Sequence, residues 1–191
     1  MNLIIGSVVG YLIGSIPCGF LLTRLRSGID LRKFGSGSTG ATNVMRVGDR
    51  KLAALTLILD ALKGAVIALL MLNKNIEFSS LFPCFCCLVG HVYPVWLRFK
   101  GGKGVATAAG VLLILSPVDT LISACIWGVV AKFFKISAVA SLSFIGSIMM
   151  ITSLEYMFDK TIFDFLVFNF VLFVFIIFTH IRNIKCLLYK T

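Results

Sequence analysis

Charged residues are scarce in this sequence, and acidic residues are the scarcest of them. Only 14% of the 191 residues are charged, with eight aspartates and glutamates against eighteen lysines and arginines. Apolar residues make up 59% of the chain and the mean hydropathy is +1.01, so too few polar residues remain to cover a soluble globule of this length. The composition therefore predicts an integral membrane protein.

The apolar residues gather in seven stretches, each of which is predicted to form a transmembrane helix. These are Leu3 to Thr23, Leu52 to Leu72, Phe78 to Leu97, Val105 to Ser116, Val118 to Ala131, Ile136 to Ser153 and Ile162 to Thr179. Most approach the ~20 residues that cross a bilayer, but the two beside Ser116-Pro117 are short, and one kinked helix is the alternative there. We expect an all-α, single-domain membrane protein over residues 1–191.

The basic residues decide between these alternatives. With a turn at Ser116-Pro117, fifteen of the eighteen cations fall on one side of the membrane, only Lys74 and Lys160 fall on the other, and Lys63 lies within a helix. Cytoplasmic loops carry such an excess of lysine and arginine. We therefore predict seven spans with the amino terminus outside and the carboxyl terminus in the cytoplasm. The net charge of +10 is explained by this orientation, so we expect no nucleic-acid partner.

Neither a cleaved leader nor a disulfide framework is expected. Met1-Asn2 gives no basic leader, and the six cysteines all lie in or beside predicted spans. Cys84, Cys87 and His91 share a helical face, but a structural zinc site normally has four ligands set by loop spacing. We therefore predict no metal and no cofactor.

The first predicted cytoplasmic loop, Phe34 to Arg46, is rich in glycine. Gly35, Gly37 and Gly40 fit the pattern G-x-G-x-x-G, but a dinucleotide fingerprint requires a preceding strand, which a chain of membrane helices does not supply. Glycines let backbone N–H groups approach an anion, and the loop adds polar donors at Ser36, Thr42, Asn43 and Arg46. The loop is predicted to bind phosphate, and a flexible polar linker is the alternative.

The second predicted cytoplasmic loop surrounds Lys103 with glycines at positions 101, 102 and 104 and leads directly into a helix. It lacks the spacing of a Walker A loop. A helix start offers free N–H groups and the positive end of the helix dipole, so we predict that Lys103 and these glycines bind an anion. Arg98 and Lys100 are interpreted as ordinary membrane anchors.

Two further pairs of polar residues are three positions apart on predicted helices. Asp60 and Lys63 can form an ion pair inside the second span, with a functional or a bracing role. His180 and Asn183 lie where the last span reaches the cytoplasmic surface, facing the same compartment as both glycine-rich loops. We predict that this second pair belongs to the site.

Five motifs, in this order along nearly the whole chain, resemble the bacterial acyl-phosphate:glycerol-3-phosphate acyltransferases, the PlsY family. They are Gly35 to Asn43 with Arg46, Leu59 to Gly64, Gly90 to Pro94, Phe99 to Thr107, and His180 to Ile184. The resemblance implies a seven-helix enzyme of the bacterial inner membrane whose active site faces the cytoplasm. Its substrates would be acyl-phosphate and glycerol 3-phosphate, its products lysophosphatidic acid and phosphate, and its partner a soluble enzyme that makes acyl-phosphate.

Matched position by position, the resemblance implies a set of site residues. The catalytic group is Lys103, His180, Asn183 and Arg46, and the substrate- or phosphate-binding group is Ser36, Gly37, Gly40, Thr42, Asn43, Gly101, Gly102, Gly104 and Ser141. Three departures from the family pattern are Ser38 in place of the usual Asn, Ile181 in place of a common Arg, and a tail ending at Thr191 without Gly-x-Glu.

The residues agree with this chemistry independently. An acyl-phosphate is already activated, so the main tasks are to neutralise two phosphates and to position the hydroxyl group. No Ser-His-Asp set is apparent, and no His-x-x-x-x-Asp pair exists, because Trp96 and Lys185 stand five residues after the two histidines. The alternatives are an anion transporter, which usually places charged ligands near the midplane, and a structural membrane subunit.

Overall fold

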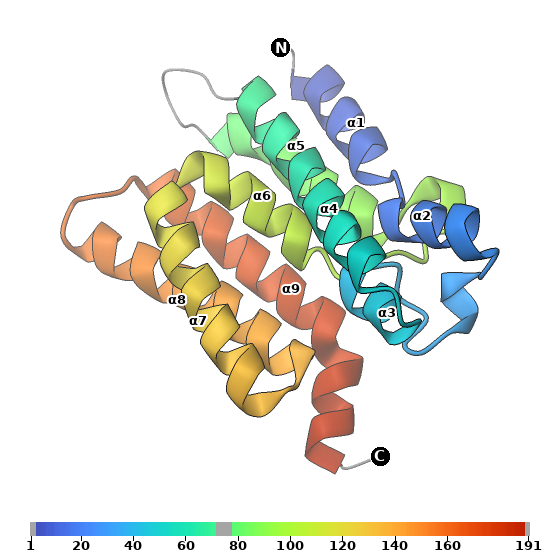
Figure 1. The fold of residues 1–191 in the computed structure, drawn as a ribbon. Coiled ribbons are helices and arrows are strands. Elements are labelled where there is room, and N and C mark those ends of the chain that lie inside the picture. The colour runs from blue at the N-terminus through green and yellow to red at the C-terminus, as the bar shows by residue number, and fades with distance from the viewer. Residues whose placement is uncertain (1–2, 72–77, 190–191) are drawn as a thin grey trace.

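A computed structural model describes residues 3–71 and 78–189, and every regular element within these ranges is a helix (Figure 1). The order along the chain is α1 (Leu3–Gly14), α2 (Cys18–Ser27), the 3₁₀ turn η1 (Leu31–Lys33), α3 (Ala41–Arg46), α4 (Arg50–Met71), α5 (Phe78–Val92), the 3₁₀ turn η2 (Val95–Leu97), α6 (Val105–Leu115), α7 (Pro117–Phe134), α8 (Ser137–Met157) and α9 (Phe163–Tyr189). Leu72 and Lys74, which the sequence analysis placed at a span end and in the following loop, lie outside the described residues.

Five helical segments of the described chain are long and apolar enough to cross a bilayer. They are Leu3–Ser27, Arg50–Met71, Pro117–Phe134, Ser137–Met157 and Phe163–Tyr189. The helices α5 and α6 are apolar but shorter, and the 11 residues of α6 extend only roughly 16 Å, about half of the hydrocarbon layer. The predicted all-helical membrane fold is confirmed, and the described residues contain five full-length candidate spans and two shorter apolar helices. The count of seven spans stays a prediction.

The first predicted span is not continuous, and proline accounts for the difference. The helix α1 ends at Gly14 and α2 begins at Cys18, with Pro17 as its N-cap residue at ψ 75°. Proline has no N–H group, and its ring disfavours helical geometry in the preceding residue. Pro94 likewise follows the end of α5 at Val92, five residues before the predicted end at Leu97.

Two other boundaries concern the second half of the chain. Ser116 separates α6 from α7 in a non-helical conformation (φ −147°, ψ 77°), and Pro117 opens α7. The chain therefore forms two helices here, as predicted, rather than one kinked helix. By contrast, α9 continues ten residues beyond the predicted end at Thr179, because no proline or glycine interrupts the segment up to Tyr189.

Glycines allow two pairs of helices to approach closely. In α1, Gly14 faces α5 so closely that a Cβ atom there would overlap the Cys87 carbonyl oxygen. In α6, a Cβ atom at Gly110 would overlap the Ala61 carbonyl oxygen of α4. Small residues at such contacts are typical of membrane helix packing, where close van der Waals contact replaces the hydrophobic effect.

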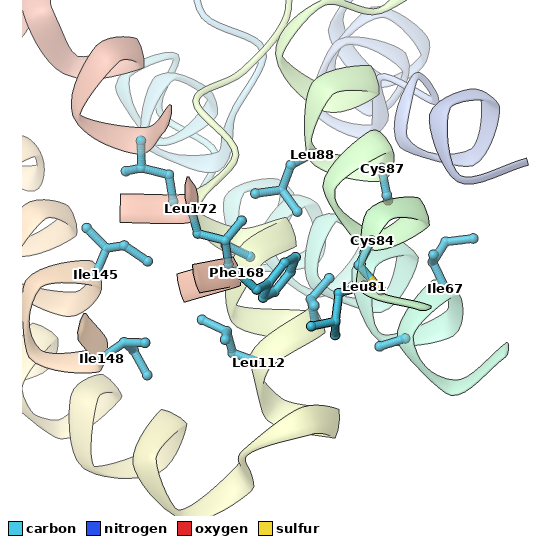
Figure 2. Packing of buried hydrophobic residues seen from close by; sticks show 14 of the residues in the cluster. Ile67, Leu81, Cys84, Cys87, Leu88, Leu112, Ile145, Ile148, Phe168 and Leu172 are labelled. Carbon is cyan, nitrogen blue, oxygen red and sulfur yellow. The ribbon is translucent and has the colours of Figure 1, made fainter. Parts of the chain in front are cut away.

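The core lies between α4, α5, α6, α8 and α9 (Figure 2). Phe168 and Leu172 of α9 contribute to it from one side, and Cys84 and Cys87 of α5 from the other. These two cysteines are packed among apolar side chains, whereas His91 lies one helical turn further on, beside Asp60. The core fixes the helices whose ends carry the polar residues described next.

Candidate active site

The glycine-rich loop before α3 is organised around a buried asparagine. The Asn43 side chain is 1% exposed, and its Oδ1 accepts the Ser36 N–H at 3.1 Å. Its Nδ2 lies 3.1, 2.9 and 2.9 Å from the carbonyl oxygens of Leu31, Phe34 and Ser38. The predicted phosphate ligand Asn43 is therefore committed to the loop itself, and we interpret it as the residue that fixes the loop's shape.

Glycine is required within this loop for steric reasons. Gly35 has φ +54°, and a Cβ atom there would overlap Asn43 Oδ1. Gly37 has φ +70°, and Gly40 is the N-cap residue of α3. The resulting shape leaves the Ser36 and Arg46 side chains exposed, so both are available to a ligand.

The start of α3 contacts the start of α8. Thr42 Oγ1 and Ser137 Oγ are 3.0 Å apart and share a hydrogen bond. Ser141 is one turn further along α8 and therefore lies on the same helix face as Ser137. The structure thus brings the predicted ligand Thr42 close to the helix that carries the predicted ligand Ser141. Ser137 was not predicted from the sequence, where it is one serine among several at a helix start.

The second glycine-rich loop uses part of its backbone for its own support. The N–H groups of Gly101 and Gly102 donate to the carbonyl oxygens of Val92 and His91, both at 3.0 Å. These two N–H groups, which the sequence analysis assigned to an anion, are therefore already bonded within the protein. Gly104 has φ +86° and opens α6 without a side-chain cap, so the free N–H groups of the helix start after it.

Lys103 joins this loop to the carboxyl-terminal half of α9. Its Nζ donates to Asn183 Oδ1 at 2.6 Å, and its own carbonyl oxygen lies 3.1 Å from Thr179 Oγ1. Burial, together with the nearby Arg46 charge, lowers the pKa of Lys103 to about 8. The structure therefore joins Lys103 to Asn183 from a distant segment, and the Arg46 charge lies near enough to Lys103 to lower its pKa. Thr179 was missed by the sequence analysis, although a polar residue beside His180 at the end of an apolar run was a usable signal.

His180 is held in a defined orientation next to this group. It is 1% exposed, and its Nδ1 lies 2.8 Å from the Ile176 carbonyl oxygen in the preceding turn of α9. Because a carbonyl oxygen only accepts, Nδ1 carries the proton in the neutral ring and Nε2 is left as an acceptor. His180 and Asn183 are three residues apart and share a helix face.

The nearby carboxylates do not neutralise the site. Asp30 pairs with Arg32, with Oδ2 and Nη2 2.9 Å apart, and the Arg32 guanidinium lowers the pKa of Asp30 to about 2. Asp49 accepts the Leu52 N–H at 2.8 Å at the start of α4. With these two carboxylates occupied, the positive charges of Lys103 and Arg46 favour an anionic ligand such as a phosphate group.

Comparison with known proteins agrees with this chemistry. Residues 4–190 match the family described as glycerol-3-phosphate acyltransferase. The chain belongs to the glycerol-3-phosphate acyltransferase family. A relative of that name from Rhizobium meliloti (strain 1021) is 51% identical over 135 residues. These residues are 71% of this chain and 66% of the relative, so the match spans just under two thirds of the relative's length. Another, from Mesorhizobium japonicum, is 49% identical over 142 residues, 74% of this chain and 72% of the relative.

Solved structures of one acyltransferase are similar over the whole chain. The crystal structure of PlsY (YgiH), described as an integral membrane glycerol 3-phosphate acyltransferase in its glycerol 3-phosphate form, has a TM-score of 0.91 and 33% identity and covers 100% of this chain and 94% of its own. The lysophosphatidic acid form has a TM-score of 0.89 and 32% identity, with 100% and 93% covered. The resemblance to the PlsY family is confirmed, and the chain is an integral membrane member of this acyltransferase family.

Proposed function

We propose that this chain transfers a fatty acyl group from acyl-phosphate to the 1-hydroxyl of glycerol 3-phosphate, giving lysophosphatidic acid and phosphate. The observation that carries the proposal is the hydrogen bond from Lys103 to Asn183 in the carboxyl-terminal half of α9, with His180 on the same helix face and the Arg46 charge near Lys103. The two glycine-rich loops meet here, because the Thr39 N–H donates to the Gly101 carbonyl oxygen at 3.3 Å. Two substrates that each carry a phosphate suit a site with two cations. The family's name and the glycerol 3-phosphate form of the similar PlsY structure support the same acceptor.

In this reaction the acceptor oxygen forms an ester bond with the acyl carbon while the bond from that carbon to the phosphate oxygen breaks. The hydroxyl proton ends on the released phosphate. Lys103 and Arg46 neutralise the phosphate charges, and Asn183 orients the Lys103 ammonium through the 2.6 Å hydrogen bond. Ser36, Thr42 and Ser141 supply neutral hydroxyl groups that position the substrates, and Asn43 holds the loop that carries Ser36.

The proposed setting is the bacterial inner membrane, with residues 1–191 forming one acyltransferase domain. Seven spans, with the amino terminus outside and the active site facing the cytoplasm, would place fifteen of eighteen cations on the cytoplasmic side. In this arrangement α5 and α6 cross as short spans beside the longer helices. A soluble enzyme that makes acyl-phosphate would deliver the donor from the cytoplasm.

This orientation predicts which positions react with a membrane-impermeant thiol reagent. Single cysteines at Gly37, Lys103 and Lys185 should be labelled only after the membrane is opened, whereas a cysteine at Asp159 should be labelled in intact cells. The background is a chain with its six native cysteines replaced. Opposite accessibility of positions 103 and 185 would contradict the seven-span arrangement, because four predicted spans separate them.

The pH dependence should report the lowered pKa of Lys103. Its ammonium form, which attracts phosphate, is present below about pH 8 in the free enzyme and is lost as the pH rises. We expect kcat/KM for glycerol 3-phosphate to be level from about pH 7 to 8, above the second phosphate pKa of about 6, and then to fall about tenfold per pH unit. The fall should disappear in Lys103→Arg, whose guanidinium stays charged. A level profile to pH 10 in the unmodified enzyme would contradict the assignment.

The direct test of the function uses purified protein in lipid, supplied with acyl-phosphate and glycerol 3-phosphate. Lysophosphatidic acid should form, and acyl-coenzyme A in place of acyl-phosphate should give little product, because no His-x-x-x-x-Asp pair is present to activate the hydroxyl toward a thioester. Robust use of the thioester would overturn the donor. Uptake of glycerol 3-phosphate into sealed vesicles without any product would overturn the enzyme proposal in favour of a transporter.

A further inference from the structure

A buried ion pair lies behind the second glycine-rich loop. The predicted pairing of Asp60 and Lys63 is confirmed: Lys63 Nζ is 2.9 Å from Asp60 Oδ1, and the two residues are only 6% and 2% exposed. Lys63 Nζ also donates to the Ile16 carbonyl oxygen at 3.1 Å, at the break between α1 and α2. His91 of α5 completes the cluster, with its Nδ1 3.5 Å from Asp60 Oδ1.

Bracing alone does not explain why these groups are charged. Removing two charges from water costs several kcal/mol per ion before pairing, and well-packed apolar residues hold helices together equally well or better. Charged residues within membrane helices generally serve a function. The Asp60–Lys63–His91 cluster should therefore do something that an apolar contact between α4 and α5 does not.

The loop rests directly on His91. The Gly102 N–H donates to the His91 carbonyl oxygen at 3.0 Å, and a Cβ atom at Gly102 would overlap Nε2 of the His91 ring. A Cβ atom at Gly101 would overlap the His91 carbonyl oxygen. The His91 ring is thus held between the Asp60 carboxylate at Nδ1 and the loop backbone at Nε2. Lys103 is the next residue along this backbone.

The same helix α4 also fixes the other side of Lys103. Gly64, which follows Lys63, packs against α6 so closely that a Cβ atom there would overlap the Thr107 carbonyl oxygen in the first turn of α6. Lys103 is therefore preceded by Gly102, which contacts His91, and followed by the start of α6, which packs against α4 (Figure 1 shows α4 beside α6). We therefore expect a movement of α4 relative to α5 to shift the backbone of Lys103.

We propose that Asp60, Lys63 and His91 are positioning residues, which seat the Gly101-Gly102 backbone and so aim the Lys103 ammonium at the phosphate of the substrate. The inference rests on the proposed acyl transfer for its functional consequence, but the seating of the loop is a separate physical claim. Misplacement of a catalytic group by about 1 Å can reduce a rate about a hundredfold, so loosening the cluster should lower kcat by roughly 10- to 100-fold.

The overlap between Gly102 and His91 provides a suppressor test. Gly102→Ala should lower kcat by more than about a hundredfold, and adding His91→Ser, which removes the ring, should raise kcat back to about the level of His91→Ser alone. His91→Ser alone should lower kcat, because the loop loses its support. The matched control is Gly104→Ala, where the added Cβ would be 3.5 Å from Val92 and does not meet His91, so His91→Ser should not rescue it. Equal rescue of both alanine variants, or rescue of neither, would overturn the proposal.

A second measurement keeps the proposal separate from the proposed function. In a chain lacking the accessible cysteines 18, 86, 125 and 186, a single Lys103→Cys should react with a charged thiol reagent at least fivefold faster or slower once Asp60→Asn is added. Lys100→Cys, on the exposed outer part of the loop, should keep its labelling rate. An unchanged labelling rate at position 103 would contradict the positioning role even if acyl transfer is observed. A wild-type protein without acyl transfer would instead contradict only the proposed function.

Discussion

Lys103→Ala should nearly abolish acyl transfer while the amount of protein in the membrane stays normal. The Lys103 ammonium is held by Asn183 at 2.6 Å and partly desolvated, with the Arg46 charge nearby, so the proposed contact with a phosphate oxygen would be charge-assisted and weakly screened. Losing such a contact in the transition state should cost on the order of 2 to 4 kcal/mol, or roughly 30- to 1000-fold in rate. The measurement is kcat/KM for acyl transfer, normalised to the amount of folded protein.

Lys100 is the matched control for this experiment. It lies three residues earlier in the same loop, carries the same charge and is exposed. At the membrane surface a lysine contributes about 1 kcal/mol through attraction to anionic headgroups, so Lys100→Ala should keep a substantial fraction of the activity. Equal and small effects of both substitutions would show that the loop anchors the protein to the lipid surface, and would remove Lys103 from the centre of the site.

The helical class was predictable because it depends on local sequence, and the candidate site residues were expected in the loops for the same reason. Long apolar runs specify membrane helices, and glycines beside cations mark the loops between them. The Asp60–Lys63 pair was equally predictable, since residues three apart meet on a helix whatever the tertiary structure. The first span was predicted without its break because its hydropathy is continuous, although Pro17 was the local signal for the end of α1.

The contacts between distant segments were not predictable from spacing. Asn43 is predicted from the sequence to bind phosphate, because an amide in a glycine-rich loop suits an anion as well as it suits backbone groups. Only the fold shows that its amide turns inward. The N–H groups of Gly101 and Gly102 were assigned to an anion for the same reason, whereas the end of α5 provides their acceptors. Polar groups are satisfied by the nearest partners in space, and sequence does not reveal those partners.

The Asn43 side chain therefore leads to a prediction that separates a loop organiser from a ligand. Asn43→Ala would leave the carbonyl oxygens of Leu31, Phe34 and Ser38 without this donor and the Ser36 N–H without its acceptor. Each buried polar group left unpaired costs about 1 to 3 kcal/mol, part of which water recovers in an outer loop. We expect the free energy that favours the ordered loop to fall by about 3 kcal/mol. The population of the ordered loop, and with it the acyl-transfer activity, should then fall by up to about a hundredfold.

Limited trypsin digestion distinguishes the two roles of Asn43. An organiser predicts that Asn43→Ala speeds cleavage at Arg46, Arg50 and Lys51 in parallel with the loss of activity, because the loop before α4 opens more often. Ser38→Ala is the control within the same loop. Its hydroxyl accepts the Gly40 N–H at the long distance of 3.4 Å, so both cleavage and activity should change less than about threefold. If Asn43→Ala lost activity but kept the wild-type cleavage rate, Asn43 would bind the substrate directly, and the loop would owe its shape to Gly35, Gly37 and the turn at η1.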